Sequence, residues 1–498
     1  MLQKFSLSGY ELIFDFSFRS QLIAIAFLLI TSITTLYSIS QNRKLEGLIG
    51  SLYCLSSLIC LFSGDFISMI ISLEFMTIFS CIIIFIGSFS VKRTRQYFLT
   101  HLFSSGLILS GISMLISKSD NTALISLTEA AYDFELPAIL ILAGCLINVG
   151  IIGFNGWIVN CYTKASASGM IYLLSFTTKI ALILILKLFS GLEILKFFGI
   201  SMMIYGLIFA LIEKKLKRLI CYLTIAQLGF TLAAIGVNSP NIIYLITVFI
   251  FLHILYNGAF VLYFAILKDI YNIKSYTELK NLPANLMLLS GFILTVLIYT
   301  SSLSISSTYI KDELANIINE HYVVIFFKIA TCTLLFGLVL ETLPSLRATK
   351  RSVAIQKNFT GLLRQNLQFF LAMTLRDLLY LSFCILTFCI CIFYPIQISH
   401  TLKLIIPAIS LLLALITRKL PKVLTKNINL DLYQYIEKFI YFSISRYKET
   451  TIDEIDQEEY FDFKIIWNNV LNKIFAWHNQ QTSIFIVISL LVGLILTL

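Results

Sequence analysis

The stretch SGMIYLLSFTTKIALILILKLFS, residues 168–190, decides the fold. It is almost wholly apolar and long enough to cross a bilayer as a helix, which takes about 20 residues. A helix satisfies its own backbone hydrogen bonds, and the lipid core offers no other partner for them. Lys179 lies in the middle of this stretch. Charge is costly there, so Lys179 is a candidate functional residue.

Similar apolar blocks recur along the chain. Of the 498 residues, 58% are hydrophobic and 13% are charged, and the mean hydropathy is +0.89. Soluble domains usually carry about a quarter charged residues. The short alternating segments of a membrane β-barrel are not evident. The sequence predicts an all-α polytopic membrane protein with about 14 spans. We expect them near 20–39, 47–63, 66–88, 98–117, 136–159, 168–190, 194–212, 219–237, 242–267, 286–307, 322–342, 377–395, 403–417 and 481–498.

The net charge of +10 indicates the topology of the chain in the membrane and not nucleic-acid binding. Basic residues collect in the loops that follow odd-numbered spans. They include Arg43, Lys44, Lys92, Arg93, Arg95, Lys214, Lys215, Lys217, Arg218, Arg347, Lys350, Arg351 and Lys357. The positive-inside rule places these loops in the cytoplasm and both termini outside it. The first apolar block is full length and lacks a small-residue cleavage site, so we expect no removable signal peptide. The pattern suits a bacterial inner membrane.

The ten cysteines lie mostly inside the predicted spans, and no two form a CxxC pair. Cys389 and Cys391 flank a single residue, a spacing that suits neither zinc nor a disulfide well. We interpret the cysteines as small packing residues, and we expect no metal and no cofactor.

Four ionisable residues in or at the ends of spans are candidates for a proton relay: Glu74, Lys179, His253 and Lys311. Buried Lys and Glu shift their pKa strongly, and His titrates near neutral pH. Structural alternatives remain for each. Glu74 has the alternative role of a neutral acid that holds two helices together. His253 has that of a packing residue, and Lys311 that of a helix anchor whose side chain reaches the membrane interface. Lys179 is the hardest to explain structurally, because its span carries no acidic residue at helical spacing.

Several motifs occur in a fixed order over about residues 15–345. GDF at 64–66 is followed by Glu74. GFNGWIVNCYTKASASG at 153–169 contains Trp157 at a characteristic distance before Lys179. LKRLICYLTIAQLG at 216–229, which includes Lys217 and Arg218, is the most specific of these motifs. Together they resemble the antiporter-like subunits shared by Mrp-type cation/proton antiporters and respiratory complex I.

The resemblance implies roles for the four ionisable residues. Glu74 corresponds to a glutamate that biases a neighbouring lysine, and Lys179 to the central lysine of the first repeat. His253 corresponds to a relay group on the central axis, and Lys311 to the terminal ionisable residue before the exit half-channel. The resemblance also implies two inverted repeats with broken helices, a recurring transporter architecture.

We therefore expect six parts in the chain. They are an N-terminal span over 1–46, a first inverted repeat over 47–190, a second over 191–345, further spans over 346–417, a polar cytoplasmic connector over 418–480 and a final transmembrane helix over 481–498. The acidic run of the connector is either a solvated face or a docking surface for a partner subunit.

Several positions depart from the family pattern. Asn148 stands where the lysine that pairs with the glutamate is expected, Asn155 where a His or Tyr is expected, and Asn257 where a further lysine is expected. The helix-breaking prolines of the family are also missing. Glycines at 150, 153 and 156 still allow the helix to break or to pack closely.

Three functions follow from this pattern. The first is a membrane component of a multisubunit Na⁺ or K⁺/proton antiporter, similar to the D component of Mrp antiporters. The motif KNINLDLY at 426–433 and the extra final span favour this function. The second is a proton-translocating membrane subunit of NADH:quinone oxidoreductase. The chain itself has no flavin, iron–sulfur or quinone-site signature. The third is a structural paralogue without transport, which Asn148 favours. Each implies other membrane subunits, the lipid bilayer and protons as partners.

Overall fold

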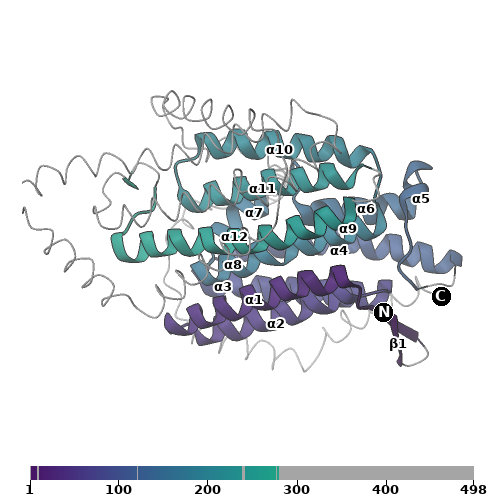
Figure 1. Cartoon of the computed structure of the whole chain (residues 1–498), viewed down its shortest axis with the longest axis horizontal. Coiled ribbons are helices and arrows are strands. Elements are labelled where there is room, and N and C mark those ends of the chain that lie inside the picture. The colour runs from purple at the N-terminus through teal and green to yellow at the C-terminus, as the bar shows by residue number, and fades with distance from the viewer. Residues whose placement is uncertain (1, 8–9, 120–121, 238–241, 276–277, 280–498) are drawn as a thin grey trace, which may run out of the picture. The chain divides into compact units, whose positions relative to one another are not determined.

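The computed structural model describes residues 2–7, 10–119, 122–237, 242–275 and 278–279. Described residues up to 111 and from 122 onward belong to one compact unit, whereas residues 112–119 belong to a second unit of which nothing else is described. The first unit is a bundle of long helices with roughly parallel axes (Figure 1). Predicted spans from residue 286 onward lie outside the described residues, as does Lys311.

The described elements follow one another in a simple order. They are β1 (Leu2–Leu7), β2 (Tyr10–Asp15), α1 (Phe18–Ser40), α2 (Lys44–Phe62), α3 (Phe66–Ser88), α4 (Val91–Ser119), α5 (Thr128–Tyr132), α6 (Leu136–Val149), α7 (Gly156–Cys161), the 3-10 turn η1 (Tyr162–Lys164), α8 (Ala167–Ser175), α9 (Thr177–Leu188), α10 (Ile194–Ile212), α11 (Leu216–Ile235) and α12 (Ile242–Tyr271).

Membrane-spanning helices are confirmed within the described part of the chain. Eight stretches there are long and apolar enough to cross a bilayer, and α8 with α9 together form one of them. The predicted span 136–159 is wrong as a single helix. It divides into α6 and α7, because Gly150 and Gly153 take positive φ angles of +89° and +93° between them. Helix α6 alone is shorter than a full span.

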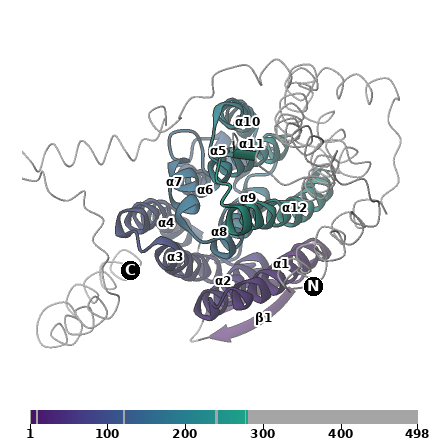
Figure 2. The same ribbon diagram turned by 90° about the vertical axis from the view of Figure 1, so that its left-hand side faces the viewer.

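The core of the bundle is the rod formed by α8 and α9. The most apolar stretch of this helix pair is completely buried. The pair packs against α1, α2, α6, α11 and α12. Figure 2, which looks roughly along the helices, shows α8 between α2 and α12. By contrast, about half of α1, α2 and α3 is exposed, and large apolar side chains such as Leu55 and Phe75 cover that surface. This apolar surface suits contact with lipid or with a membrane partner, because its exposure to water would be unfavourable.

The hairpin of β1 and β2 was not predicted. Its two strands pair antiparallel, with Leu7 opposite Tyr10 at the turn. Asp65 ties this hairpin to the start of α3. Its carboxylate accepts hydrogen bonds from Ile13 N at 2.8 Å and from Ser68 N at 2.7 Å. Asp65 is therefore an N-cap that also anchors the hairpin, a structural role for the GDF motif.

Helices α10 and α11 approach each other backbone to backbone. A Cβ atom on Gly199 of α10 would lie 2.2 Å from Ala233 N and 2.4 Å from Gly229 O, both on α11. Such distances are far below van der Waals contact, and both neighbours are backbone atoms that cannot move aside. Close helix approach through small residues is a common way to associate helices in membranes.

We predict that Gly199→Ala lowers the stability of the bundle by about 1–3 kcal/mol, because the added methyl group separates α10 from α11. Gly106→Ala on α4 is the matched control, since a Cβ there has no neighbour within 4 Å. The measurement is the thermal unfolding midpoint in detergent. Equal midpoints for the two variants would show that α10 and α11 do not pack as described.

Candidate functional site

The first feature of the site is the break between α6 and α7. Helix α6 ends at Gly150, and the chain resumes a helical course at Gly156. Trp157 is 1% exposed, and its Nε1 donates to Ile147 O at 3.3 Å across the break. Irregular backbone at membrane depth is tolerated only where protein or a water-filled cavity surrounds it. Asn148, 6% exposed, lies in the last turn before the break.

The second feature is a break between α8 and α9 at Phe176, whose φ and ψ are −107° and −72°. No glycine or proline causes it. The N–H of Thr177, just past the break, donates to the Tyr53 hydroxyl at 3.2 Å instead of continuing the helix ladder. Backbone bonds run from Phe176 N to Tyr172 O and from Lys179 N to Phe176 O. Of these N–H groups, that of Thr177 is therefore held by a side chain and the others by backbone carbonyls.

Lys179 lies directly after this break and is completely buried. Its Nζ donates to the carbonyl oxygen of Leu174 at 2.6 Å. No ion pair joins it to a carboxylate of any described residue. An amine at this depth normally pairs with another group or faces a polar pathway. Here a backbone carbonyl at a helix break takes the place of the counter-ion.

A cluster of buried hydroxyl groups surrounds the same break. The Thr177 hydroxyl is hydrogen-bonded to the Tyr53 hydroxyl, and it lies 3.2 Å from the Tyr97 hydroxyl. The ring of Tyr162 lies next to that of Tyr97, with centroids 6.2 Å apart. All three tyrosines are fully buried. Side chains from α2, α4 and η1 thus converge on Thr177, two residues before Lys179.

Glu74 lies apart from these groups. It is half-buried on α3, on the side that also carries Ile71, Phe75 and Ile78, each about half exposed. No hydrogen bond joins Glu74 to another described residue. The structure therefore places it on the outward side of the bundle. In the described part of the bundle, Lys179 and Asn148 are buried in the interior, but this carboxylate is not.

His253 lies inside the bundle on α12. It is fully buried, and its ring is 5.9 Å from Phe249 and 5.2 Å from Tyr256, centroid to centroid. The Tyr256 hydroxyl donates to Gln227 Oε1 at 2.6 Å. Asn257 Nδ2 donates to Thr224 Oγ1 at 3.5 Å. The motif at 216–229 thus supplies polar partners to the helix that carries His253.

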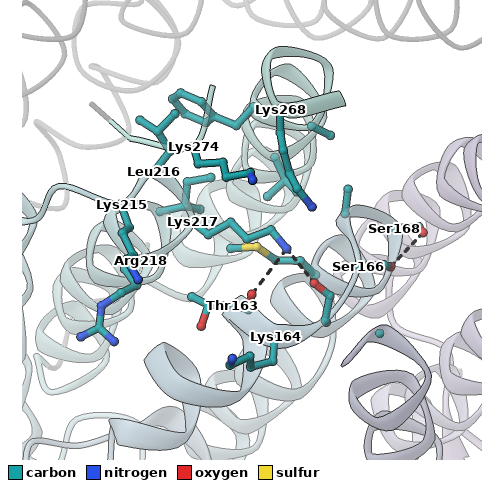
Figure 3. A pocket seen from close by; sticks show the side chains of 18 of the residues that line it. Thr163, Lys164, Ser166, Ser168, Lys215, Leu216, Lys217, Arg218, Lys268 and Lys274 are labelled. Carbon is teal, nitrogen blue, oxygen red and sulfur yellow. Dashed lines mark hydrogen bonds between the residues drawn. The ribbon is translucent and has the colours of Figure 1, made fainter. Parts of the chain in front are cut away.

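Lys217 and Arg218 of this motif fix the backbone at one end of the bundle. Lys217 Nζ donates to Ala165 O at 2.7 Å, and Arg218 forms an ion pair with Glu213 at 2.8 Å. Figure 3 shows both on the wall of a cavity of about 620 Å³. The wall is strongly basic and also carries Arg43, Arg93, Lys164, Lys215, Lys268 and Lys274. The two motif residues have structural partners here, and basic residues from several of the predicted loops gather at this end of the bundle.

Sequence reasoning missed several buried ionisable residues, among them His101 and Glu46. The fourth span was predicted to begin at 98, near His101, but α4 begins at Val91, so His101 lies about three turns inside the helix. Glu46 was placed in a loop, but it lies in the first turn of α2 and is 1% exposed. Its carboxylate accepts hydrogen bonds from the Ser166 and Ser168 hydroxyls and pairs with Arg43 at 3.2 Å. It therefore ties α2 to the start of α8.

Comparison with known proteins identifies the family. The family profile "NADH:quinone oxidoreductase/Mrp antiporter, TM" matches residues 63–337, more than half of the chain. The chain therefore belongs to this family of antiporter-like membrane subunits, and it is a membrane-embedded multi-pass protein. This confirms the resemblance that the motifs indicated.

Individual relatives are more distant. The chain is 32% identical over 208 residues to NADH-quinone oxidoreductase subunit N of Leptospira interrogans, covering 36% of this chain and 40% of the relative. It is 30% identical over 206 residues to NADH-ubiquinone oxidoreductase chain 2 of Rhizopus oryzae, covering 38% and 39%. A subunit N of Thermodesulfovibrio yellowstonii is 25% identical over 291 residues, covering 54% and 63%. The matches thus span about two fifths to under two thirds of the relatives' length.

Solved structures share the fold. The Mrp complex from Dietzia sp. DQ12-45-1b contains a chain with a TM-score of 0.60 at 15% identity, covering 69% of this chain and 68% of that one. The membrane-bound sulfane sulfur reductase, an archaeal respiratory membrane complex, gives 0.58 at 16% identity, covering 67% and 75%. At these identities the likeness establishes the fold alone.

We predict that Tyr53→Phe destabilises the protein by about 1–3 kcal/mol, because it leaves the buried N–H of Thr177 without a partner at the break. Tyr132→Phe is the matched control. The Tyr132 hydroxyl also bonds two backbone groups, Gly191 O and Glu193 N, but its side chain is 50% exposed and water can replace it. The thermal unfolding midpoint in detergent measures both. An equal loss in the two variants would contradict the role given to Tyr53.

Proposed function

We propose that this chain is a proton-translocating membrane subunit of a multisubunit respiratory or antiporter assembly. One observation carries the proposal: Lys179 is fully buried at a helix break, beside a hydroxyl cluster and without a carboxylate partner in the described part of the chain. Burying an amine inside the membrane is energetically unfavourable, and a purely structural role does not explain it.

In the proposed mechanism, Lys179 alternates between ammonium and neutral amine. The Leu174 carbonyl accepts a hydrogen bond from either form, so the side chain keeps its position while it gains or loses a proton. The hydroxyls of Tyr53, Tyr97 and Thr177 both donate and accept hydrogen bonds. They therefore provide a path along which a proton reaches the break.

The remaining relay residues follow from the family pattern. His253 on α12 is the next interior group, and Lys311 is the terminal one, beyond the described residues. Glu74 faces outward from α3, so it meets a neighbouring subunit rather than the interior of this chain. In that position it is suited to couple proton movement here to the state of the neighbour.

We further propose a bacterial inner membrane as the location, with the basic end of the bundle in the cytoplasm and both termini outside. The six-part division and the two inverted repeats over 47–190 and 191–345 belong to the same proposal. The breaks at 150–155 and at Phe176 lie within the first of these repeats and support it. Broken helices at repeat interfaces are typical of secondary transporters.

The names of the relatives favour an assembly of the NADH:quinone oxidoreductase type. The sequence motif at 426–433 favours an Mrp-type antiporter instead, and we give the relatives more weight. A structural paralogue without transport is the second candidate, because Asn148 cannot carry a proton as the expected lysine does. Under all three, the direct partners are other membrane subunits. Na⁺ or K⁺ is a further substrate only in the antiporter assembly.

We expect Lys179→Met to reduce proton flux by on the order of ten-fold or more, since the interior then has no group to hold the proton at the break. The measurement is dye-monitored acidification of vesicles that contain the native assembly, driven by quinone-linked electron transfer or by a sodium or potassium gradient. Lys44→Met is the control, because Lys44 is exposed at the start of α2. Full flux in Lys179→Met, with normal assembly, would support the structural paralogue instead.

The assembly itself is tested by mild-detergent purification from native membranes and mass spectrometry of the subunits that accompany the chain. We expect peripheral redox subunits. Recovery of small hydrophobic antiporter subunits alone would contradict this and place the chain in a cation/proton antiporter.

A further inference from the structure

The structure places a histidine beside the position where the proton relay of the first repeat is interrupted. Asn148 occupies the place of the expected lysine on α6. The side chain of His101 on α4 lies within interaction distance of Asn148. Helices α4 and α6 are held together one turn further on, where Ser104 Oγ donates to Gly144 O at 2.9 Å. His101 is 2% exposed, so this contact lies inside the protein.

We propose that His101 carries the proton at this point of the relay, in place of the missing lysine. The inference rests on the proposed function and adds a residue that the family pattern does not supply. A side chain from a neighbouring helix would thus restore the ionisable group that Asn148 lacks.

Several buried polar side chains near the two helix breaks lack a hydrogen-bond partner. Nine buried side-chain polar atoms of the described residues have none, and five of the nine lie at the two breaks or on the elements α4 and η1. They are His101 Nε2, Asn148 Oδ1, Asn155 Nδ2, Tyr162 Oη and Thr178 Oγ1. They belong to the two helix breaks and to the side chains between them. Buried polar groups are almost always satisfied by protein or by ordered water. Ordered water beside these side chains would satisfy them and would supply the mobile hydrogen bonds that a proton relay needs.

Two contacts connect His101 to the hydroxyl cluster beside Lys179. The imidazole ring lies on the ring of Tyr97, with centroids 4.2 Å apart. The Tyr97 hydroxyl reaches the Thr177 hydroxyl at 3.2 Å, and Thr177 lies at the break that positions Lys179. A ring contact carries no proton, so the proposed transfer needs water between the imidazole and the Tyr97 hydroxyl and between Thr177 and Lys179, and it needs no further reactant.

The acid–base chemistry of imidazole suits a relay group at this position. Imidazole titrates near neutral pH, and its two nitrogens accept and donate protons in turn. Tyr97 and Trp157 enclose the ring on two sides, Trp157 edge-to-face at a centroid distance of 4.6 Å. Burial without a carboxylate partner disfavours the charged imidazole, so a proton on His101 would be held only briefly, as a relay group requires.

No described carboxylate forms a hydrogen bond or an ion pair with His101. The titratable groups on the named elements are Tyr97, Lys92, Arg93, Arg95 and Lys118 on α4, Cys145 on α6, Cys161 on α7, Tyr162 and Lys164 on η1, and Lys179 and Lys187 on α9. Among the basic groups, Lys179 is the fully buried one. The charges of His101 and Lys179 therefore oppose each other, which favours transfer of one proton between them over double occupancy.

The test uses the native assembly in vesicles and compares His101→Gln with the double variant His101→Gln/Asn148→Lys. We expect His101→Gln to assemble and to lose proton flux by on the order of ten-fold or more. Lysine at 148 should restore most of the flux and should extend it to higher pH, because an amine keeps its proton where imidazole loses it. Ser104→Ala, one turn along α4, controls for the loss of a buried polar group.

Three outcomes decide between the proposals. Full flux in His101→Gln, when Lys179→Met abolishes it, would overturn the role of His101 and leave the proposed function intact. Full flux in Lys179→Met would overturn both. Loss of flux in His101→Gln that lysine at 148 does not restore would assign His101 a structural role. Should His101→Gln not assemble, Asn148→Lys alone in the native background is decisive: an unchanged pH profile of flux would overturn the proposal.

Discussion

The hydrogen bond from Lys179 Nζ to the Leu174 carbonyl is the interaction on which the interior depends. A fully buried amine needs an acceptor, because burying an unpaired charge is strongly unfavourable. The described residues provide a peptide carbonyl at a helix break instead of a carboxylate. A carboxylate partner would hold the proton on the lysine, whereas a neutral carbonyl leaves the amine free to titrate. The break at Phe176, the buried lysine and the hydroxyl cluster on Thr177 therefore form one arrangement.

The two helix breaks arise from different causes. Gly150 and Gly153 make the first by taking φ angles that other residues disfavour, in place of the prolines typical of the family. At the second, the Tyr53 hydroxyl takes the N–H of Thr177. The polar side chains at the breaks, Asn148, Asn155 and Thr177, are all buried, so they are kept from lipid. Proline is therefore not required for a broken membrane helix when neighbouring side chains bind the released peptide groups.

Much of the fold could be predicted because long apolar blocks directly encode membrane helices. The positions of Lys179 and His253 inside the bundle also followed from the rule that intramembrane ionisable residues face inward. The break at Phe176 could not be predicted, since its cause is Tyr53, more than 120 residues away. His101 was missed because the start of α4 was predicted seven residues too late, and helix ends are the least certain part of such a prediction. The outward position of Glu74 depends on which face of α3 packs, which an almost uniformly apolar helix does not reveal.

The central claim is that the two breaks enclose a hydrated polar path between Asn148 and Lys179. A high-resolution cryo-EM map of the native assembly tests it most directly. The account predicts ordered water beside His101, Asn148 and Thr178, continuous with the Tyr97 and Thr177 hydroxyls, and a broken helix at Phe176. A dry interior in which these side chains bond only to protein, or an unbroken helix through Phe176, would contradict it.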